Sequence, residues 1–407
     1  MGFGGNKNMK IVWICHTTND EIQKKLNVYK KTKELSPWIF SLSKLLSKKN
    51  NLEIHIISPH EYISKYKKFK LNNITYHFFN AHIPLYGRHW PNFFKFDYFT
   101  NFFFTNLKIR KIVRSINPDI IQLYGSENAY YSSSILQFLK KYPVLVTIQG
   151  FISLSSNYSY LTKKRISIEK KIFEKFKHFG IRTKTMELQI LEKKPNAILH
   201  WHGFPQNVIP PLNIPINEKK YDCVFFARIT KDKGIEDLLK AISRIKIWKR
   251  DISLNVIGNY QNDSYKKYLL DMCENLDIIK NVTWTGFLPS QLDVHTKVSY
   301  SKISILPTYH EIISGTIIES LFLKIPVVAY DVGSIHELNK DFNVVKLIEK
   351  GNIDCLANQI YKLIIDNKEI NRLAEIGFKV ISQRYNDEQI MKETILAYQE
   401  VIDDFNN

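Results

Sequence analysis

Two carboxylates, Glu311 and Glu319, stand eight positions apart in residues 307–338, PTYHEIISGTIIESLFLKIPVVAYDVGSIHEL. Residues 314–316 (Ser-Gly-Thr) lie between them and form a small polar opening to a short expected helix. Helix amino termini attract phosphate through unpaired amides and the helix dipole, and carboxylates accept hydrogen bonds from sugar hydroxyls. An apolar strand is expected on each side of this segment, and ligands of open α/β sheets bind at the carboxyl ends of strands. The combination favours a nucleotide-sugar site.

The spacing of the two carboxylates limits where they can lie. On one continuous helix, eight residues turn through about 800° and leave the pair roughly 80° apart. We therefore expect Glu311 in the loop and Glu319 within the helix, where both can reach one elongated ligand. In the competing interpretation Glu311 caps the helix and Glu319 is an ordinary solvated residue.

Two cations follow the apolar strand expected at 223–227. Arg228 offers a planar fork of donors and Lys233 a compact charge, and together they suit a diphosphate. In a lysine-rich chain an Arg-x4-Lys pair is also typical of a surface loop. Its place between a strand and a helix that starts at Gly234 favours the phosphate contact.

Further candidates in the second half follow two more expected strands. Gly258 comes after strand 253–257, at a point where backbone could approach a ligand. Phe287 and Leu288 come after strand 281–284 and could lie against a flat base. A plain turn is the alternative at Gly258.

Candidates in the first half stand at strand ends as well. Gln149 and Gly150 directly follow strand 144–148, and Glu127 follows strand 119–124. Arg182 closes a basic segment, residues 163–184, and is a fourth candidate on the acceptor side of an interdomain cleft. A structural turn and a substrate contact remain equally open for the strand-end residues.

Length and composition restrict the class of protein. A chain of 407 residues predicts two domains, and its 44% hydrophobic content suffices for packed cores. The four cysteines are far apart, which favours a reducing cytoplasm over a disulfide framework. No apolar run approaches eighteen residues and no secretory signal is visible, so no membrane span is expected. The histidines form no metal set, and no Asp-x-Asp box follows a strand, so we expect no metal and no other cofactor.

The positive charge is confined to the first half. Residues 1–200 hold 33 Lys and Arg against 12 Asp and Glu, whereas residues 201–407 hold 25 against 27. A basic domain attracts anionic surfaces. Anionic lipid headgroups, a phosphate-bearing acceptor and nucleic acid are the candidate partners.

Alternating strand and helix patterns predict an α/β fold with two doubly wound, Rossmann-like parallel sheets facing each other across a cleft. We expect a basic acceptor domain at 1–205, a proline-rich linker at 205–216, and a donor domain at 206–385. A helix at 386–407 is expected to pack back toward the first domain. Two segments stay open: the aromatic stretch 76–104 is either a packed helical hairpin or a membrane-interface element, and the basic segment 163–184 is either a solvated face or a membrane or polyphosphate contact.

Taken jointly, these motifs resemble the GT-B glycosyltransferases, and within them family four, the retaining and metal-independent group. The resemblance is carried by Ala-Arg228-x4-Lys233-Gly234, Gly258, TGFLP, Glu311-x7-Glu319 and PVVAYDVGSIHEL, over roughly residues 219–340. The first half matches more loosely, through NPDII and VLVTIQG.

The resemblance implies a role for each matching residue. Arg228 and Lys233 would hold the donor diphosphate, Glu311 would contact the transferred sugar, and Glu319 would accept hydrogen bonds from the ribose hydroxyls. The remaining donor contacts would be the helix-terminal amides of Ser314, Gly315 and Thr316, and the base contacts of Phe287 and Leu288.

The chain departs from the family at three places. CHTTNDEIQKK replaces the usual Gly-Gly loop after the first strand, Gln149 replaces a frequent histidine, and Ala227 replaces the usual glycine before Arg228. A glutamine cannot act as a general base, so a hydrogen bond to sugar or phosphate is expected there.

The implied function is transfer of a sugar from a UDP- or GDP-linked donor to a glycan or lipid-linked acceptor, with retention of configuration. A setting in polysaccharide, capsule or lipopolysaccharide biosynthesis is expected, with the protein peripheral on the inner face of the cytoplasmic membrane. The alternatives are a nucleotide-sugar epimerase or soluble glycan synthase of similar fold and, from another class, a basic nucleic-acid-binding protein, which no recognised binding motif supports.

Overall fold

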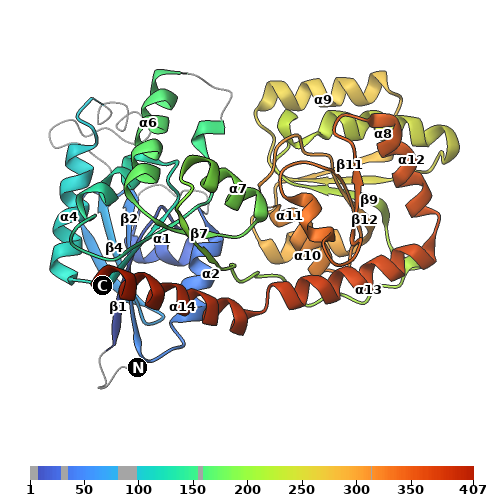
Figure 1. The fold of residues 1–407 in the computed structure, drawn as a ribbon. Coiled ribbons are helices and arrows are strands. Elements are labelled where there is room, and N and C mark those ends of the chain that lie inside the picture. The colour runs from blue at the N-terminus through green and yellow to red at the C-terminus, as the bar shows by residue number, and fades with distance from the viewer. Residues whose placement is uncertain (1–7, 29–34, 81–98, 155–158, 313) are drawn as a thin grey trace. The chain divides into compact units, whose positions relative to one another are not determined.

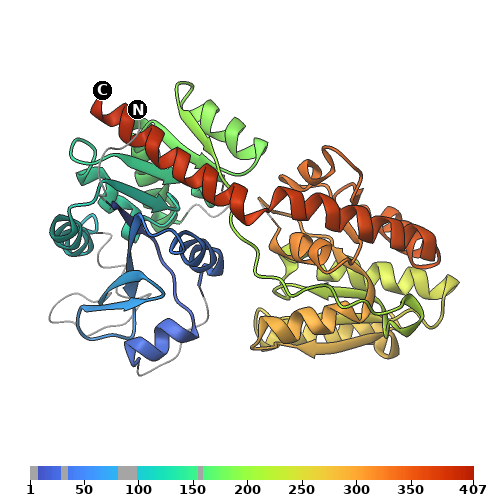
Figure 2. The same ribbon diagram turned by 90° about the horizontal axis from the view of Figure 1, so that it is seen from below.

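The structure is a computed structural model that describes residues 8–28, 35–80, 99–154, 159–312 and 314–407. It divides into two compact units, each built on its own sheet (Figures 1 and 2). The first unit comprises residues 1–182, 186–205 and 386–407, and the second comprises residues 183–185 and 206–385.

The first unit has an eight-stranded sheet with the order β3-β4-β2-β1-β5-β6-β7-β8. All neighbours pair in parallel except β3 and β4, which are antiparallel. Its strands are β1 (Met9–Ile14), β2 (Leu52–His60), β3 (Lys67–Leu71), β4 (Ile74–Asn80), β5 (Ile120–Tyr124), β6 (Val144–Thr147), β7 (His178–Ile181) and β8 (Ile198–Trp201). Its helices are α1 (Asp20–Leu26), α2 (Pro37–Leu46), α4 (Phe103–Ile116), α5 (Ala129–Ser132), α6 (Tyr160–Lys175), α7 (Lys184–Lys193) and α14 (Asp387–Asn406).

The second unit has a six-stranded, wholly parallel sheet with the order β11-β10-β9-β12-β13-β14. Its strands are β9 (Tyr221–Phe226), β10 (Leu254–Ile257), β11 (Val282–Gly286), β12 (Ser301–Leu306), β13 (Val327–Tyr330) and β14 (Val345–Ile348). Its helices are α8 (Ile235–Trp248), α9 (Asp263–Asn275), α10 (Gln291–Ser299), α11 (Gly315–Phe322), α12 (Ile353–Ile364) and α13 (Asn367–Arg384). In Figure 1, α8, α9 and α12 lie on one side of this sheet and α10, α11 and α13 on the other.

The predicted pair of doubly wound parallel sheets is confirmed. In each sheet the chain winds outward from a central strand in one direction and then in the other. This reversal falls between β1 and β5 in the first unit and between β9 and β12 in the second. Open α/β sheets bind ligands at such a switch point, outside the carboxyl ends of the strands. The fold therefore marks one candidate binding position in each unit.

The last helix, α14, belongs to the core of the first unit. Its apolar face contributes Ile390, Ala397, Tyr398 and Val401 to the same buried cluster as β1 and β2. The Trp13 indole nitrogen donates to the Tyr398 hydroxyl at 2.9 Å, and that hydroxyl also contacts the Gln122 side chain.

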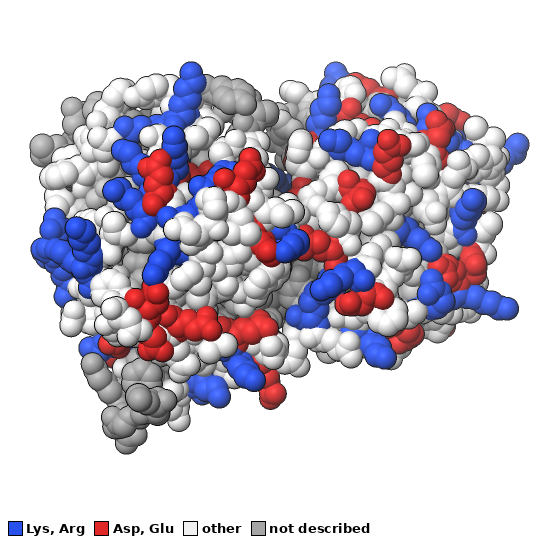
Figure 3. Space-filling model, viewed as in Figure 1, with Lys and Arg blue, Asp and Glu red and all other residues white. Residues whose placement is uncertain are grey.

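The charge of the first unit is moderated by α14. The unit holds 33 Lys and Arg against 18 Asp and Glu, a net +15, because α14 adds six acidic residues and one lysine. In Figure 3, acidic side chains form a band over α14, and basic side chains gather over α4. The α4 residues are Lys108, Arg110, Lys111 and Arg114.

Several sequence expectations are corrected by the structure. The Ser36-Pro37 pair predicts a helix with Ser36 as its cap and Pro37 at its first position. α2 does begin at Pro37, but Ser36 does not cap it, because its φ is +52° and no side-chain hydrogen bond to the helix forms. In the aromatic stretch 76–104, residues 76–80 belong to β4, residues 103–104 begin α4, and residues 81–98 lie outside the described residues. Cysteines this far apart are expected to be buried apolar residues. Cys15, Cys223 and Cys273 are buried, whereas Cys355 is exposed.

The basic segment 163–184 contains most of α6 and all of β7. The buried side of α6 consists of Thr162, Ile168, Glu169, Ile172 and Phe173. In the part of the chain that the structure describes, no helix has the length and apolar content required to cross a membrane.

Candidate functional site

The candidate site of the second unit lies where β9 and β12 end side by side. Lys233 ends a short 3-10 turn (Lys231–Lys233) after β9, and Glu311 stands in the loop after β12. The Lys233 ammonium lies 2.6 Å from the Glu311 carboxylate, and both side chains are 16% exposed. An ammonium has three donors, so Lys233 can bind Glu311 and a further anion at once.

The two loops are fastened to each other by backbone contacts. The Tyr309 amide donates to the Asp232 carbonyl at 2.8 Å, and the Thr308 hydroxyl donates to the same oxygen at 3.3 Å. The Tyr309 hydroxyl donates to Asp237 on α8 at 2.5 Å. Lys233 and Glu311 are thus held together by a rigid frame as well as by their own attraction.

Three glycines with positive φ make this close packing possible. A Cβ on Gly234 would lie 1.8 Å from the Pro307 carbonyl oxygen, and one on Gly258 would lie 1.8 Å from that of Ala227. A Cβ on Gly333 would lie 1.6 Å from the Glu311 carbonyl oxygen. In this structure Gly258 therefore allows β9 and β10 to approach at the site. Gly333 was missed as a site residue, and no signal beyond its place in the motif GSIHEL marks it.

The amino terminus of α11 approaches the end of β9. The Ser314 hydroxyl accepts from the Ile317 amide at 3.3 Å and so caps the helix, the role that the competing interpretation gave to Glu311. The Thr316 hydroxyl donates to the Phe226 carbonyl at 3.0 Å, two residues before Arg228. Gly315 is exposed at the first position of the helix.

Glu319 lies one turn into α11 and is fixed by α10. One of its oxygens, Oε2, is 2.9 Å from Gln291 Nε2 and 3.2 Å from His295 Nε2. Its other oxygen, Oε1, would lie 3.7 Å from a Cβ on Gly315. Sequence reasoning missed both α10 partners, although their i, i+4 spacing places them on one helix face.

The remaining second-unit candidates are less closely connected. Arg228 is exposed and, among the described residues, has no ion-pair or hydrogen-bond partner. Phe287 is 59% exposed on the loop after β11. Leu288 is instead packed against a small apolar cluster around Phe226 and Val298.

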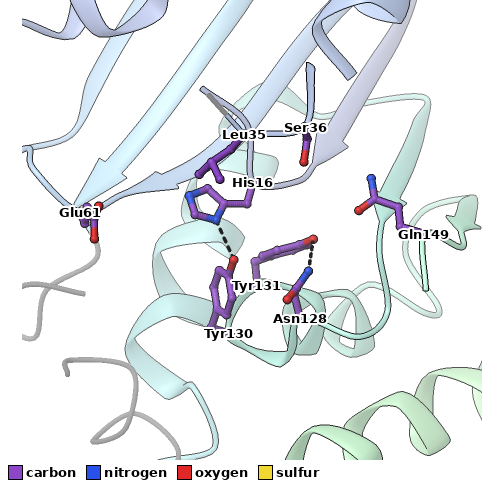
Figure 4. Close-up of a pocket in the computed structure, with 8 residues that line it drawn as sticks. All are labelled: His16, Leu35, Ser36, Glu61, Asn128, Tyr130, Tyr131 and Gln149. Atoms are coloured by element: carbon purple, nitrogen blue, oxygen red, sulfur yellow. Dashed lines mark hydrogen bonds between the residues drawn. The ribbon is translucent and has the colours of Figure 1, made fainter. Parts of the chain in front are cut away.

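The first unit has a pocket of about 420 Å³ at its own switch point (Figure 4). Residues after β1, β2, β5 and β6 line it, and Leu35 and Ser36, just before α2, complete the wall. The His16 ring nitrogen Nδ1 lies 2.7 Å from the Tyr130 hydroxyl. Burial, with a smaller contribution from His60, lowers the pKa of His16 to about 3, so this ring is neutral.

Glu127 and Gln149 meet over Gly125. A Cβ on Gly125 would lie 2.7 Å from Glu127 Oε1 and 3.0 Å from Gln149 Oε1. Burial raises the pKa of Glu127 to about 7, with a smaller upward contribution from Glu169. Of the candidates in this unit, Gln149 lines the pocket and Glu127 lies beside it, 2.9 Å from Asn128 Nδ2.

The other two first-unit candidates lie apart from the pocket lining. Gly150 is half-buried directly after Gln149. The Arg182 guanidinium stacks over the Phe204 ring at 4.5 Å, and it lies 3.5 Å from the Ile148 carbonyl.

Comparison with known proteins agrees with this arrangement. Residues 212–380 match the family model described as Glycosyl transferases group 1. The matched residues lie within the second unit, which contains the Lys233–Glu311 pair.

The named proteins that match this chain in sequence share only low identity with it. The capsular polysaccharide biosynthesis glycosyltransferase CapM of Staphylococcus aureus is 25% identical over 178 residues, which cover 43% of this chain and 44% of CapM. The putative teichuronic acid biosynthesis glycosyltransferase TuaC of Bacillus subtilis is 21% identical over 246 residues, 55% of this chain and 56% of TuaC. The chain spans about half the length of the curated relatives it matches.

Similarity to solved structures extends over nearly the whole chain. Sucrose-phosphate synthase of Thermosynechococcus elongatus has a TM-score of 0.76 at 14% identity, covering 97% of this chain and 99% of that one. Anabaena Alr3699/HepE, solved in complex with UDP and glucose, has a TM-score of 0.69 at 14% identity, covering 97% and 100%. At these identities the likeness concerns the fold, which is of the GT-B type.

Proposed function

We propose that this chain is a glycosyltransferase that moves a sugar from a nucleoside-diphosphate donor to a hydroxyl of a glycan or lipid-linked acceptor. The observation that carries the proposal is the Lys233–Glu311 pair at the switch point of a group 1 glycosyltransferase domain. The α11 amino terminus, tied to β9 through Thr316, supports an anion beside that pair.

The proposed chemistry follows from where charge develops. When the bond between the anomeric carbon and the diphosphate oxygen breaks, its electron pair stays on the diphosphate. Lys233, Arg228 and the α11 amides would stabilise that charge, as preorganised donors do in other enzymes. The acceptor hydroxyl forms the new bond to the anomeric carbon, and its proton passes to the departing phosphate oxygen. Attack on the face that the phosphate leaves would retain the configuration.

In the proposed donor complex the remaining groups bind rather than react. Glu311 would contact the transferred sugar while still paired with Lys233. Glu319, held at Oε2 by α10, would offer Oε1 to a ribose hydroxyl. Exposed Phe287 would cover the base. UDP is the first nucleotide to test, because Alr3699/HepE was solved with it and shares this fold.

The direct test is turnover with a panel of UDP- and GDP-hexoses and uncharged methyl glycosides, with products followed by NMR. We expect a new glycosidic bond whose anomeric configuration matches the donor, in EDTA as well as in buffer. Lys233→Ala should lose about 10²–10³-fold in kcat. Lys231→Ala, an exposed lysine of the same turn, should stay near the wild-type value. A sugar altered at a carbon other than C1 without acceptor would indicate an epimerase and contradict the proposal.

We also propose that the first unit meets anionic lipid through the basic face of α4, where Arg110, Lys111 and Arg114 lie. Basic residues near an anionic surface contribute about 1 kcal/mol each, and the attraction falls as salt rises. Flotation with phosphatidylglycerol vesicles should show binding that weakens with salt. Absent or salt-independent binding would contradict this part.

A further inference from the structure

The last two turns of α14 rest on two buried histidines at the edge of the first unit's sheet. His178 Nδ1, on β7, lies 2.9 Å from His200 Nε2, on β8. His178 Nε2 lies 2.8 Å from Asp404 on α14, and His200 Nδ1 lies 3.0 Å from Glu400, one turn earlier on the same helix. We call these four side chains the α14 cluster. They form one hydrogen-bonded series with a carboxyl group at each end.

The α14 cluster needs one proton more than its residues carry when both acids are ionised and both rings are neutral. Each of its three contacts requires one hydrogen, and two neutral imidazole rings supply two. A carboxylate supplies none. Without a third proton, either two nitrogen lone pairs face each other at 2.9 Å or one contact between a ring and a carboxylate has no hydrogen. The set of contacts is therefore complete only when the cluster holds one added proton.

A second histidine pair in the same unit has similar geometry but needs no added proton. His55 Nδ1 lies 3.0 Å from His77 Nε2, and the ring centroids are 5.2 Å apart, as they are in the first pair. Glu53 ends this series at 2.9 Å from His55, but the Tyr66 hydroxyl ends it on the other side, 2.7 Å from His77. The phenol donates the third hydrogen, so two neutral rings suffice. Burial lowers the pKa of both His55 and His77, in agreement with neutral rings.

The groups around the α14 cluster restrict where the added proton lies. Lys177 donates to Asp404 at 2.7 Å and makes the largest contribution that lowers the pKa of this carboxyl group. Burial lowers the pKa of His200 and also lowers that of His202, which follows β8, to about 3. The neighbouring strand β6, VLVT, adds no titratable side chain. With Asp404 ionised and His200 neutral, the added proton is held by one of the other two members of the cluster.

We propose that the α14 cluster is a proton-linked latch that fastens the last two turns of α14 to β7 and β8. Docking of these turns takes up one proton, and loss of that proton releases them. The pH around the first unit thereby sets how firmly its last helix is held. The latch does not depend on the proposed transferase function.

The sign of the pH dependence follows from the uptake of a proton. An exposed histidine loses its proton near pH 6.5, and the docked cluster keeps its proton above that value. The latch is therefore fully closed below about pH 6.5 and weakens as the pH rises. One proton changes the opening equilibrium by up to about tenfold per pH unit. A histidine that is buried as a neutral ring has the opposite effect.

Hydrogen exchange of the full chain between pH 6 and pH 9, corrected for its intrinsic pH dependence, measures the opening of the latch. Above about pH 6.5, amides of residues 401–406 should open more often, by up to about tenfold per pH unit. Amides of residues 390–396, in the first half of the same helix, should change less. Opening of residues 401–406 that does not depend on pH overturns the proposal.

Glu400→Gln tests the proton count directly. The amide of glutamine can donate to His200 Nδ1 and so complete the series without an added proton. This variant should keep the last turns docked and lose most of their pH dependence. Asp403→Asn removes the same charge from an exposed position on the same turn and should behave like wild type. If Glu400→Gln keeps the wild-type pH dependence, or leaves the last turns open at every pH, the proposal is wrong.

Nitrogen NMR of histidine-labelled protein gives a second readout, which a purely structural contact would not change. At pH 6.5 the two rings and the carboxyl partners of the α14 cluster should share three hydrogens. In Glu400→Gln the same two rings should be neutral, as the rings of His55 and His77 are in both proteins. Ring signals of His178 and His200 that are identical in wild type and Glu400→Gln at pH 6.5 and at pH 9 overturn the proposal.

Discussion

At the scale of single residues, the second-unit site depends on glycines that hold two loops in contact. Gly333 has a φ of +57°, and its α-carbon faces the carbonyl of Glu311, so no side chain fits there. The ion pair of Lys233 with Glu311 requires that this loop stay in place. Gly333 thus positions Glu311, the proposed contact to the transferred sugar, and through it the paired Lys233.

Gly333→Ala tests that dependence. The added methyl would lie 1.6 Å from a backbone oxygen, in a conformation that L-residues rarely adopt. We expect a loss on the order of 3 kcal/mol in the free energy of unfolding and weaker donor binding. Gly351 also has a positive φ, +81°, but a Cβ there would make only an ordinary contact at 3.9 Å. Gly351→Ala should therefore lose about 1–2 kcal/mol in the free energy of unfolding and keep donor binding. Urea unfolding and calorimetry make the comparison, and equal losses in both variants would contradict the account.

At the scale of helices and strands, the strands that could be predicted are those formed by a short apolar run in the sequence. β5, β6, β9 and β10 all lie within a residue or two of their expected bounds, which were 119–124, 144–148, 223–227 and 253–257. β7 and β8 were not predicted, because each of HFGI and ILHW carries a histidine and β7 lies within a basic segment. Their polar residues find partners only in the fold: His178 and His200 pair at 2.9 Å, and α14 supplies Asp404 and Glu400 to them.

The candidate site followed the same pattern. Strand ends and the helix opening marked Lys233, Glu311, Ser314 and Thr316 as candidates, because these lie close in sequence to recognisable elements. The partners of Glu319 on α10 could not be predicted, because the contact joins residues 24 and 28 positions apart. The Ser-Pro pattern predicted the start of α2 but not the role of Ser36, whose left-handed backbone (φ +52°) differs from the extended conformation of a capping serine.

Tyr398→Phe tests the packing of α14 against the first unit. Removing the hydroxyl leaves the buried Trp13 indole donor without its acceptor, which should cost about 1–3 kcal/mol in the free energy of unfolding. Leu396→Ala changes a residue of the same helix that is 50% exposed and should stay within about 0.5 kcal/mol of wild type. Urea titrations in which the two variants behave alike would show that this hydrogen bond does not secure α14.

At the scale of the whole molecule, the two units differ in how they should respond to acid. Burial lowers the pKa of His77 and His202 to about 3 and of His60 to about 4, and each of these lies in the first unit. Burial also lowers the pKa of His16, His55 and His200 in that unit. The folded unit therefore holds these rings neutral, whereas the unfolded chain protonates them below about pH 6.5.

The sign of the effect follows from this difference. Stability is fully present above about pH 6.5 and is lost as the pH falls toward the folded-state values. At pH 5 each ring with a folded pKa near 3 costs up to about 2 kcal/mol. Glu127 acts in the opposite direction, because its raised pKa stabilises the fold as the pH falls below about 7. This gain offsets part of the stability that is lost through one of the buried histidines.

We therefore expect the first unit to open before the second between pH 7 and pH 5. Hydrogen exchange, corrected for its intrinsic pH dependence, should show faster opening in β1 and β2 than in β9 and β10 at pH 5. His202→Gln should reduce the difference, and exposed His310→Gln should not. The same pH dependence in both units would contradict the assignment.

The central claim is that the ends of β9 and β12 hold the diphosphate of the donor. Calorimetry with UDP and UMP, and with GDP and GMP, isolates the contribution of the second phosphate. For at least one of the two nucleosides, wild type, Lys231→Ala and Glu311→Gln should bind the diphosphate more tightly than the monophosphate. Lys233→Ala should lose most of that preference, about 10–100-fold in affinity. If Lys233→Ala binds the diphosphate as tightly as wild type does, the claim is wrong.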